Sequence, residues 1–349
     1  MKNTIQHATV LGSGVMGSQI ACHLANAGIR VLLLDIPPQE LNEQEEKAGR
    51  SLEDRAVRNR IVNDHLAHAV KMNPAPLFQK SYRDRITTGN FDDDLSLIKN
   101  TDWIIEVVVE RLDIKQSLFE RVEKHRQPGT FISSNTSGIP IHTMLKGRSE
   151  DFQKHFLGTH FFNPPRYLEL LELIPTEKTD HGVLEFFLHY GERYLGKTTV
   201  RCKDTPAFIA NRVGVYSIMD LFHKVRELDL SIEDVDKLTG PVIGRPKSAT
   251  FRTADVVGLD TLIHVANNLR EALDDPAQQQ TFELPDFLRK MQEKDWLGAK
   301  SGQGFYKKIK GEDGTSTILS LDLDTLEYSE QSKSKFVTLE QTKEVAEVA

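Results

Sequence analysis

Two hydrophobic patterns divide the chain. In the first 200 residues or so, short apolar runs of strand length alternate with stretches of helical spacing, beginning at residues 8–11 and 29–34. The run at residues 102–110 is almost continuously apolar, which is typical of a strand buried on both faces of a parallel sheet. Further strands are expected at residues 130–134, 157–162, 167–174 and 198–202. The pattern predicts an α/β fold with a doubly wound, mainly parallel sheet.

The second pattern has apolar residues at helical spacing and no alternating strands. Ser231 and Asp234 form a capping box, which marks the start of one helix. Other helices are expected at residues 206–225, 253–272 and 285–294. The sequence therefore predicts a first domain at 1–203 and a second, all-helical domain at 204–310. The polar residues 311–349 are expected to form a tail or linker.

Three glycines follow the first strand in a G-x-G-x-x-G pattern. Gly12 permits a tight turn, Gly14 lets a pyrophosphate approach the backbone, and Gly17 allows a helix to pack closely on the sheet. The helix expected at residues 18–27 offers unpaired N–H groups to the phosphates. A strand then ends in Asp35. This context predicts a Rossmann-type dinucleotide site.

Asp35 lies roughly 20 residues beyond the glycines, where a carboxylate accepts hydrogen bonds from a ribose 2′-hydroxyl. A 2′-phosphate would meet a negative charge there, so NAD is favoured over NADP. A simple glycine-rich connection would explain the glycines but not the acid. The predicted NAD-binding loop consists of Gly12, Ser13, Gly14, Val15, Met16 and Gly17.

Composition narrows the classes of partner. The 349 residues carry a net charge of −7, which argues against nucleic acid or an acidic membrane as the main partner. Cys22 and Cys202 are too few and too far apart for a disulfide framework or a metal-ligand cluster. No run reaches transmembrane length, and the N-terminus lacks a signal-peptide pattern. A cytoplasmic enzyme is expected.

A polar helical arm is expected at about residues 41–73. It carries Arg55, Arg58 and Arg60 on neighbouring turns. These cations could meet a polyanionic ligand, or they could form a solvated basic face. The sequence leaves both alternatives open.

His160 and Glu172 are the sharpest candidates for chemistry. His160 ends one predicted strand and Glu172 lies in the next, with a turn at residues 163–165 that lets the strands double back. A carboxylate beside an imidazole sets its tautomer and stabilises the imidazolium, as a dehydrogenase requires. The alternative for a histidine near an apolar strand is a hydrogen-bonded core residue. Its place at the carboxyl edge of a nucleotide-binding sheet favours catalysis.

Other polar residues lie at strand ends or helix starts. Glu110 follows a buried strand at the edge where open α/β sheets bind ligands. Ser137 could bond the nicotinamide, ribose or substrate, or serve turn chemistry. Asn211 could bind a carbonyl oxygen or make a helix-packing contact. Lys115 could approach the nucleotide or lie on the surface.

Five motifs occur in a characteristic order over roughly residues 5–308. They are Gly12-Ser-Gly-Val-Met-Gly17, Glu106-Val-Val-Val-Glu110-Arg-Leu-Asp-Ile-Lys115, Ser134-Asn-Thr-Ser137, His160-Phe-Phe-Asn163-Pro164 with Glu172, and Cys202-Lys-Asp-Thr-Pro206-Ala-Phe-Ile-Ala-Asn211-Arg212. In this set the chain closely resembles the L-3-hydroxyacyl-CoA dehydrogenases of fatty-acid β-oxidation.

The resemblance implies NAD-dependent oxidation of an (S)-3-hydroxyacyl-CoA. It implies that His160 is the general acid/base, that Glu172 orients it, and that Ser137 and Asn211 contact the substrate. The stretch at residues 240–255 departs from the family pattern and adds basic residues near the expected cleft.

For the cofactor, the resemblance implies that Asp35, Glu110, Lys115 and Asn163 help to hold NAD, and Ser137 lies beside them. It further implies that the helical arm contacts CoA and that the helical domain contributes to a homodimer. The tail resembles a junction in larger multidomain β-oxidation proteins. Two rival interpretations are a dehydrogenase for a CoA-free hydroxy acid and a non-catalytic NAD-binding protein.

Overall fold

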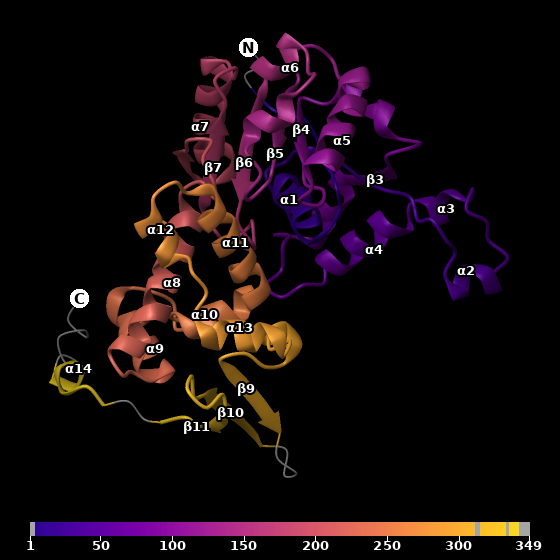
Figure 1. The fold of residues 1–349 in the computed structure, drawn as a ribbon. Helices are drawn as coiled ribbons and strands as arrows, with labels where there is room; N and C mark the ends of the chain where they lie inside the picture. Colours follow the sequence, from indigo (N-terminus) through magenta and orange to yellow (C-terminus); the bar gives the residue numbers. More distant parts are fainter. Residues whose placement is uncertain (1–3, 311–314, 333–334, 342–349) are drawn as a thin grey trace. The chain divides into compact units, whose positions relative to one another are not determined.

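The computed structural model describes residues 4–310, 315–332 and 335–341. The chain forms two compact units, Met1–Ile209 and Ala210–Ala349 (Figure 1). Residues 204–209, which we expected to open the second domain, belong to the first unit.

An eight-stranded sheet forms the centre of the first unit, in the order β3-β2-β1-β4-β5-β6-β7-β8. Its strands are β1 (His7–Leu11), β2 (Arg30–Asp35), β3 (Ile86–Asn90), β4 (Trp103–Glu106), β5 (Phe131–Ser134), β6 (Phe156–Phe161), β7 (Leu170–Pro175) and β8 (Thr198–Arg201). All neighbours are parallel except β6 and β7. The order 3-2-1-4-5-6 is that of dinucleotide-binding sheets, so the predicted fold class is confirmed.

Helices cover both faces of this sheet. They are α1 (Val15–Asn26), α2 (Glu43–Lys47), α3 (Arg55–Arg58), α4 (Arg60–Ala69), α5 (Leu112–His125), α6 (Glu150–Lys154) and α7 (His181–Leu195). Short 3₁₀ helices are η1 (Lys80–Arg85), η2 (Leu95–Asn100) and η3 (Ile141–Leu145). One apolar core joins α1, α4 and α7 to the sheet, and the other joins α5, α6, η2 and η3. On β4, Trp103 faces the first core and Ile104 the second, as expected for a strand buried on both sides.

The arm is not one helix. It is divided into α2, α3 and α4, with Gly49 at a φ of 63° after the first piece. Helix α2 buries no residue, whereas α4 buries Val62, Leu66 and Ala69. Tertiary packing stabilises most helices in proteins, which explains why only the piece with an apolar face extends over several turns.

The second unit is mainly helical. Its elements are α8 (Ala210–Glu227), α9 (Ile232–Thr239), η4 (Pro241–Ile243), α10 (Phe251–Val257), α11 (Leu259–Ala272), α12 (Pro276–Thr281), α13 (Asp286–Glu293), η5 (Ala299–Ser301), β9 (Tyr306–Lys310), β10 (Ser316–Leu321), β11 (Tyr328–Glu330) and α14 (Val337–Gln341). The helix expected at residues 253–272 is two helices, because Gly258 adopts a φ of 96° between them. Phe222, Phe251, Phe287 and Phe305 form an aromatic cluster inside the unit.

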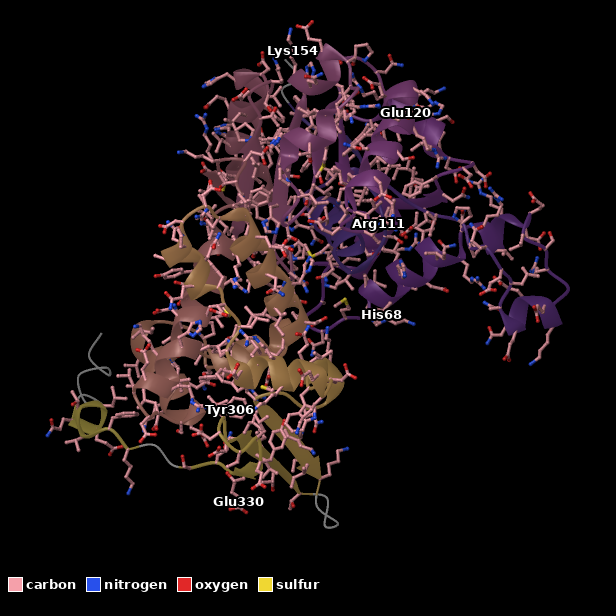
Figure 2. All side chains as sticks on the ribbon, viewed as in Figure 1. His68, Arg111, Glu120, Lys154, Tyr306 and Glu330 are labelled. Atoms are coloured by element: carbon pink, nitrogen blue, oxygen red, sulfur yellow. The ribbon has the colours of Figure 1, made fainter. Side chains whose placement is uncertain are left out.

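The segment after the last core helix corrects one expectation. Strands β10 and β11 lie where the sequence indicated a polar tail or linker, and β9 lies at the end of the domain expected to be all-helical; the three strands form an antiparallel sheet. Tyr306, labelled in Figure 2, anchors this sheet by donating its hydroxyl hydrogen to Asp236 Oδ2 at 2.8 Å. Asp255 accepts the N–H groups of Phe305 and Tyr306, each at 2.8 Å. Three parts of the expected tail, at residues 311–314, 333–334 and 342–349, lie outside the described residues.

No helix in the described part of the chain is long and apolar enough to cross a membrane.

Candidate functional site

The polar candidates of the first unit gather at one edge of its sheet. The parallel strands β1 to β6 all end at this edge, which is the ligand-binding edge of open α/β sheets. The glycine loop follows β1, Asp35 ends β2, and Glu106 ends β4. His160 lies near the end of β6. The sheet therefore brings together residues that are far apart in the sequence.

The glycine loop has the shape that the sequence predicts. Gly12 has a φ of 102°, and a Cβ there would lie 2.6 Å from the Val107 carbonyl oxygen. A Cβ on Gly17 would lie 1.9 Å from the Gly12 carbonyl oxygen, whereas one on Gly14 would meet nothing within 4 Å. Gly12 and Gly17 thus meet a close backbone approach, while Gly14 leaves open space.

Helix α1 begins at this open space. Its N-cap residue, Gly14, provides no side-chain hydrogen bond, and the first turn contains no acidic residue. The N–H groups and the positive end of the helix dipole are thus available to an anionic phosphate. The loop and the helix N-terminus fit the pyrophosphate of a dinucleotide.

Asp35 is held by the glycine loop. Ser13 donates to Asp35 Oδ2 from its backbone N–H at 2.7 Å and from its hydroxyl at 2.5 Å. His65 on α4 completes the group, with its Nδ1 at 2.8 Å from Ser13 Oγ and 3.8 Å from Asp35 Oδ2. Sequence reasoning missed His65, because only the packing of α4 on α1 brings it to this loop.

Glu110 is bound by the turn that follows β5. Its Oε1 accepts from Thr136 Oγ1 at 2.5 Å and from the N–H groups of Ser137 and Gly138 at 3.0 Å each. Partial burial opposes ionisation, but the Lys115 ammonium and these hydrogen bonds hold the pKa of Glu110 below its ordinary value. Glu110 therefore remains an anionic acceptor at this edge.

Lys115 is neither on the surface nor directed at open space. Its Nζ lies 2.7 Å from Glu106 Oε1 and 3.3 Å from Glu110 Oε2, and the side chain is 1% exposed. Burial raises the pKa of Glu106, and the Lys115 ammonium opposes that shift. Glu106 also accepts from Ser134 Oγ at 2.5 Å and from the Val108 N–H at 2.7 Å. The sequence analysis gave Glu106 no role. In the structure its buried carboxylate binds the Lys115 ammonium, which also contacts Glu110.

His160 and Glu172 form a buried pair. They lie directly opposite each other in the antiparallel pairing of β6 with β7, and His160 Nδ1 is 2.7 Å from Glu172 Oε2. The other carboxylate oxygen of Glu172 accepts from the Ile209 N–H at 3.1 Å. Because a carboxylate can only accept, His160 Nδ1 carries the proton in this contact and the neutral ring keeps its lone pair on Nε2.

The loop between β6 and β7 carries Asn163 and is fixed from two sides. Gln19 on α1 donates from Nε2 to Asn163 Oδ1 at 3.0 Å. Lys197, which is buried, donates to the carbonyl oxygens of Pro165 and Leu168. Burial lowers the pKa of Lys197 to about 8, and Glu169 opposes this shift. Neither Gln19 nor Lys197 was recognised in the sequence, because their partners lie up to 144 positions away.

The two residues expected to contact the substrate are Ser137 and Asn211. Ser137 is exposed, and its backbone N–H is bound to Glu110. Asn211 lies in the first turn of α8, in the second unit. Their contacts with a substrate remain predictions.

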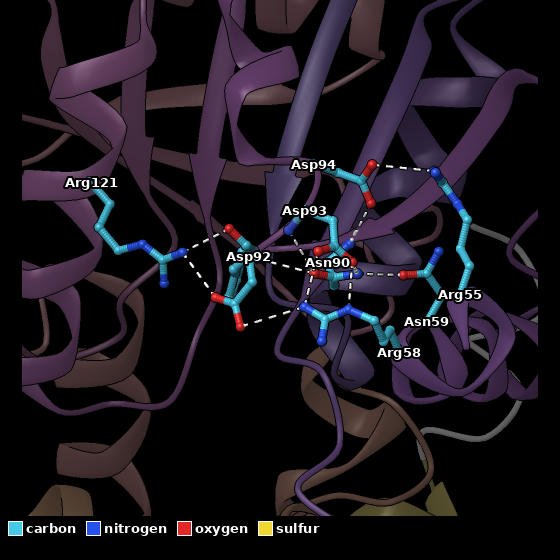
Figure 3. A network of polar contacts seen from close by, with 9 residues as sticks. Arg55, Arg58, Asn59, Asn90, Asp92, Asp93, Asp94 and Arg121 are labelled. Atoms are coloured by element: carbon cyan, nitrogen blue, oxygen red, sulfur yellow. Dashed lines mark hydrogen bonds and ion pairs between the residues drawn. The ribbon is translucent and has the colours of Figure 1, made fainter. Parts of the chain in front are cut away.

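The three clustered arginines of the arm are paired with acids. Arg58 binds Asp93 through two hydrogen bonds of 2.6 and 3.0 Å, and Arg55 Nη2 lies 3.2 Å from Asp94 Oδ1. Figure 3 shows this network around Asn90, at the end of β3. Arg60 binds Glu45 at 2.5 Å. Neighbouring carboxylates therefore balance the charge of these three arginines, a pairing that neither of the two alternatives drawn from the sequence included.

The fold and this edge define a Rossmann-type protein that binds a dinucleotide. Residues 7–205 match the family "3-hydroxyacyl-CoA dehydrogenase, NAD binding domain", and residues 208–308 match "3-hydroxyacyl-CoA dehydrogenase, C-terminal domain". The chain belongs to the 3-hydroxyacyl-CoA dehydrogenase family, and its first unit holds the family's NAD-binding domain.

Individual relatives agree with this assignment. A probable 3-hydroxyacyl-CoA dehydrogenase of Bacillus subtilis is 50% identical over 344 residues, covering 99% of this chain and 43% of the relative. One of Deinococcus radiodurans is 46% identical over 308 residues, covering 88% of this chain and 84% of the relative. The crystal structure of FadB2 from M. tuberculosis has 31% identity and a TM-score of 0.70, covering 88% of this chain and all of that one. The chain thus spans less than half the length of its Bacillus relative.

Proposed function

We propose that this chain catalyses the NAD-dependent oxidation of (S)-3-hydroxyacyl-CoA to 3-oxoacyl-CoA in fatty-acid β-oxidation. The observation that carries the proposal is the buried contact of His160 with Glu172 at the nucleotide edge of the sheet. Membership of the family supports the reaction type and the acyl-CoA substrate.

His160 acts as the general acid/base. Its Nε2 lone pair accepts the proton of the substrate's 3-hydroxyl, and Glu172 stabilises the imidazolium that forms. NAD, when bound, supplies the acceptor for the hydride that leaves carbon 3. In the reverse direction the imidazolium polarises the 3-oxo group and returns the proton. Burial of the pair strengthens this electrostatic assistance, because water screens it poorly.

The cofactor is held by the loop from Gly12 to Gly17 and by Asp35, Glu110 and Asn163. The phosphates bind at the α1 N-terminus, and the Asp35 carboxylate accepts from a ribose hydroxyl. Lys115 serves the cofactor indirectly, by fixing the orientation and charge of Glu110.

The substrate is contacted by Ser137 and Asn211, whose hydroxyl and amide groups suit hydrogen bonds to the 3-oxygen or the thioester. We further propose that the arm at 41–73 contacts CoA. The helical domain contributes to a homodimer, or the chain is part of a larger multidomain enzyme. Light scattering of the purified chain measures its molecular mass and so tests for the homodimer.

The test is NADH formation by the purified chain with NAD and (S)-3-hydroxybutyryl-CoA. A medium-chain analogue and a CoA-free hydroxy acid are run beside it. We expect turnover that requires CoA. Turnover with the CoA-free acid alone would instead favour the rival dehydrogenase class.

His160→Gln tests the assigned base. We expect it to abolish turnover and to leave NADH binding intact, because it removes the proton acceptor but not the nucleotide site. His181→Gln, at an exposed position on α7, is the matched control. Near-normal turnover of His160→Gln would remove His160 from the mechanism, and NADH binding without turnover in the unaltered chain would favour the non-catalytic alternative.

A further inference from the structure

A pocket of about 590 Å³ lies in the first unit between α4 and the segment at residues 75–83. Its volume falls within the roughly 300–1,000 Å³ of small-molecule sites, which are mostly apolar with a few polar groups. The apolar lining consists of Leu66, Ala67, Val70, Ala75, Leu77 and Phe78. We call this the α4 pocket.

The charged residues that line the α4 pocket are all positively charged. Lys71, Lys80 and Arg83 line it, and no acidic side chain does. Within the described residues, neither lysine forms an ion pair, and Arg83 only donates a long hydrogen bond of 3.4 Å to the Ile86 carbonyl. This local positive charge contrasts with a chain whose net charge is −7. An apolar cavity with cations along it complements a molecule with an apolar body and an anionic group.

Helix α4 separates this pocket from the nucleotide edge. His65 on α4 contacts Ser13 in the glycine loop. Successive helical residues are rotated by about 100°, so the side chains of Ala67 and Val70 point about 160° and about 140° away from that of His65 around the helix axis. The α4 pocket therefore uses the side of the helix that faces away from the nucleotide loop.

The wall of the pocket is held in place by the β6–β7 loop. Arg166 donates to the carbonyl oxygens of Ala75 and Leu77 at 2.6 and 2.9 Å, and its guanidinium lies 4.4 Å from the centre of the Phe78 ring. The Tyr167 hydroxyl donates to the Ala75 carbonyl at 2.9 Å. These contacts order the wall before any ligand arrives, which lowers the entropic cost of binding.

We propose that the α4 pocket binds a free carboxylate with a medium or long alkyl chain. The alkyl chain packs on the accessible apolar wall formed by Ala67, Val70 and Phe78, and the carboxylate pairs with Lys71, Lys80 or Arg83. Part of its lining belongs to the arm that we propose contacts CoA, but binding of a free carboxylate is a further property and does not depend on the dehydrogenase reaction.

The test is calorimetric titration of the full chain with octanoate, decanoate and dodecanoate below their micelle concentrations. Each methylene that becomes buried tightens binding by up to about fourfold, from roughly 0.8 kcal/mol per CH₂. We expect one saturable site per chain, with affinity rising along the series. Dodecyltrimethylammonium, which has the same chain and the opposite charge, is expected not to bind there.

Variants locate the site. Ala67→Trp fills the pocket from an exposed helical position and is expected to weaken dodecanoate binding at least tenfold. His68→Trp, on the adjacent exposed position labelled in Figure 2, is the matched control and does not line the pocket. Lys71→Glu with Lys80→Glu is likewise expected to weaken binding tenfold or more, whereas Lys99→Glu on η2 is expected not to. Circular dichroism and thermal unfolding verify that each variant is folded.

Three results would overturn the proposal. They are equal affinity of Ala67→Trp and the unaltered chain, equal binding of the cationic analogue, and complete displacement of dodecanoate by acetoacetyl-CoA. The last would assign the carboxylate to the substrate site. Because the titration involves no turnover, its failure leaves the dehydrogenase assay unaffected, and an inactive chain can still bind dodecanoate.

Discussion

Replacement of Glu172 by glutamine tests the chemistry of the buried pair most directly. Glu172 accepts hydrogen bonds from His160 Nδ1 at 2.7 Å and, on its other oxygen, from the Ile209 N–H at 3.1 Å. Glutamine has nearly the same shape but only one acceptor oxygen. The variant therefore cannot satisfy both donors, although it fits the same space.

The magnitude follows from the two ways in which glutamine can lie. If its oxygen remains on Ile209, its NH₂ group faces Nδ1, which must then be an acceptor. The ring proton moves to Nε2, and the general base is lost. If its oxygen faces His160 instead, the Ile209 N–H loses its acceptor, and because Ile209 is partly exposed the cost is that of an ordinary hydrogen bond, about 0.5–1.5 kcal/mol, or roughly 2–13-fold. The carboxylate that stabilises the imidazolium is missing in both cases, and a comparable change in a serine-protease triad costs about 10⁴-fold.

We therefore expect Glu172→Gln to lower kcat by roughly 10²–10⁴-fold, with NADH affinity within about twofold of the unaltered chain. Steady-state NADH formation gives kcat, and quenching of protein fluorescence gives NADH affinity. Glu185→Gln on α7, where the carboxylate is largely exposed, is the control for loss of a negative charge. The reasoning is refuted if a folded Glu172→Gln variant keeps kcat within threefold, or if Glu185→Gln loses as much.

Three further predictions concern the cofactor site and the second unit. Gly17→Ala is expected to prevent folding or NADH binding, because the added methyl group would collide with the loop backbone. Gly14→Ala is expected to fold and to bind NADH more weakly. Thermal unfolding measures the folding of each variant, and fluorescence titration measures its NADH affinity. Asp35→Ala is expected to narrow the preference for NAD over NADP, and an unchanged ratio of kcat/KM values would remove Asp35 from the ribose site. Burial raises the pKa of Asp255 from 3.8 to about 6 despite two N–H donors, so the protonated form is favoured in the folded state. This contribution, about 3 kcal/mol at most, is present below pH 4 and is lost as pH rises to about 6. Denaturant unfolding should therefore show a fall over this range that Asp255→Asn lacks, and parallel pH curves for the two proteins would contradict the assignment.

Local pattern was enough to predict much of the nucleotide-binding unit. The glycine spacing, the strand that ends in Asp35 and the apolar run at 102–110 are all short-range signals, and they predict the Rossmann-type order that the sheet adopts. The contact of His160 with Glu172 could also be predicted from the sequence. The turn expected at residues 163–165 lets the second strand return antiparallel to the first, and the observed pairing places the two side chains opposite each other.

Partners that are distant in the sequence were not predictable in this way. The arginines of the arm left a polyanion site and a solvated basic face open as alternatives, because nothing near them in the sequence shows that Asp93 and Asp94 pair with Arg58 and Arg55. The burial of Lys115 between Glu106 and Glu110 depends on how α5 packs against the end of β4. Polar residues carry no periodic signal that identifies such partners.

The sequence by itself determined the class of fold, the NAD-binding loop and the candidate base, because each depends on backbone conformation or strand pairing over a few residues. Only the tertiary structure decided which charges are paired, that the segment after residue 305 adds an antiparallel sheet, and that α4 closes a pocket with the segment at 75–83. The physical reason is that burial and ion pairing depend on distances across the fold. Those distances are set when the helices pack, and they cannot be inferred from the local order of residues.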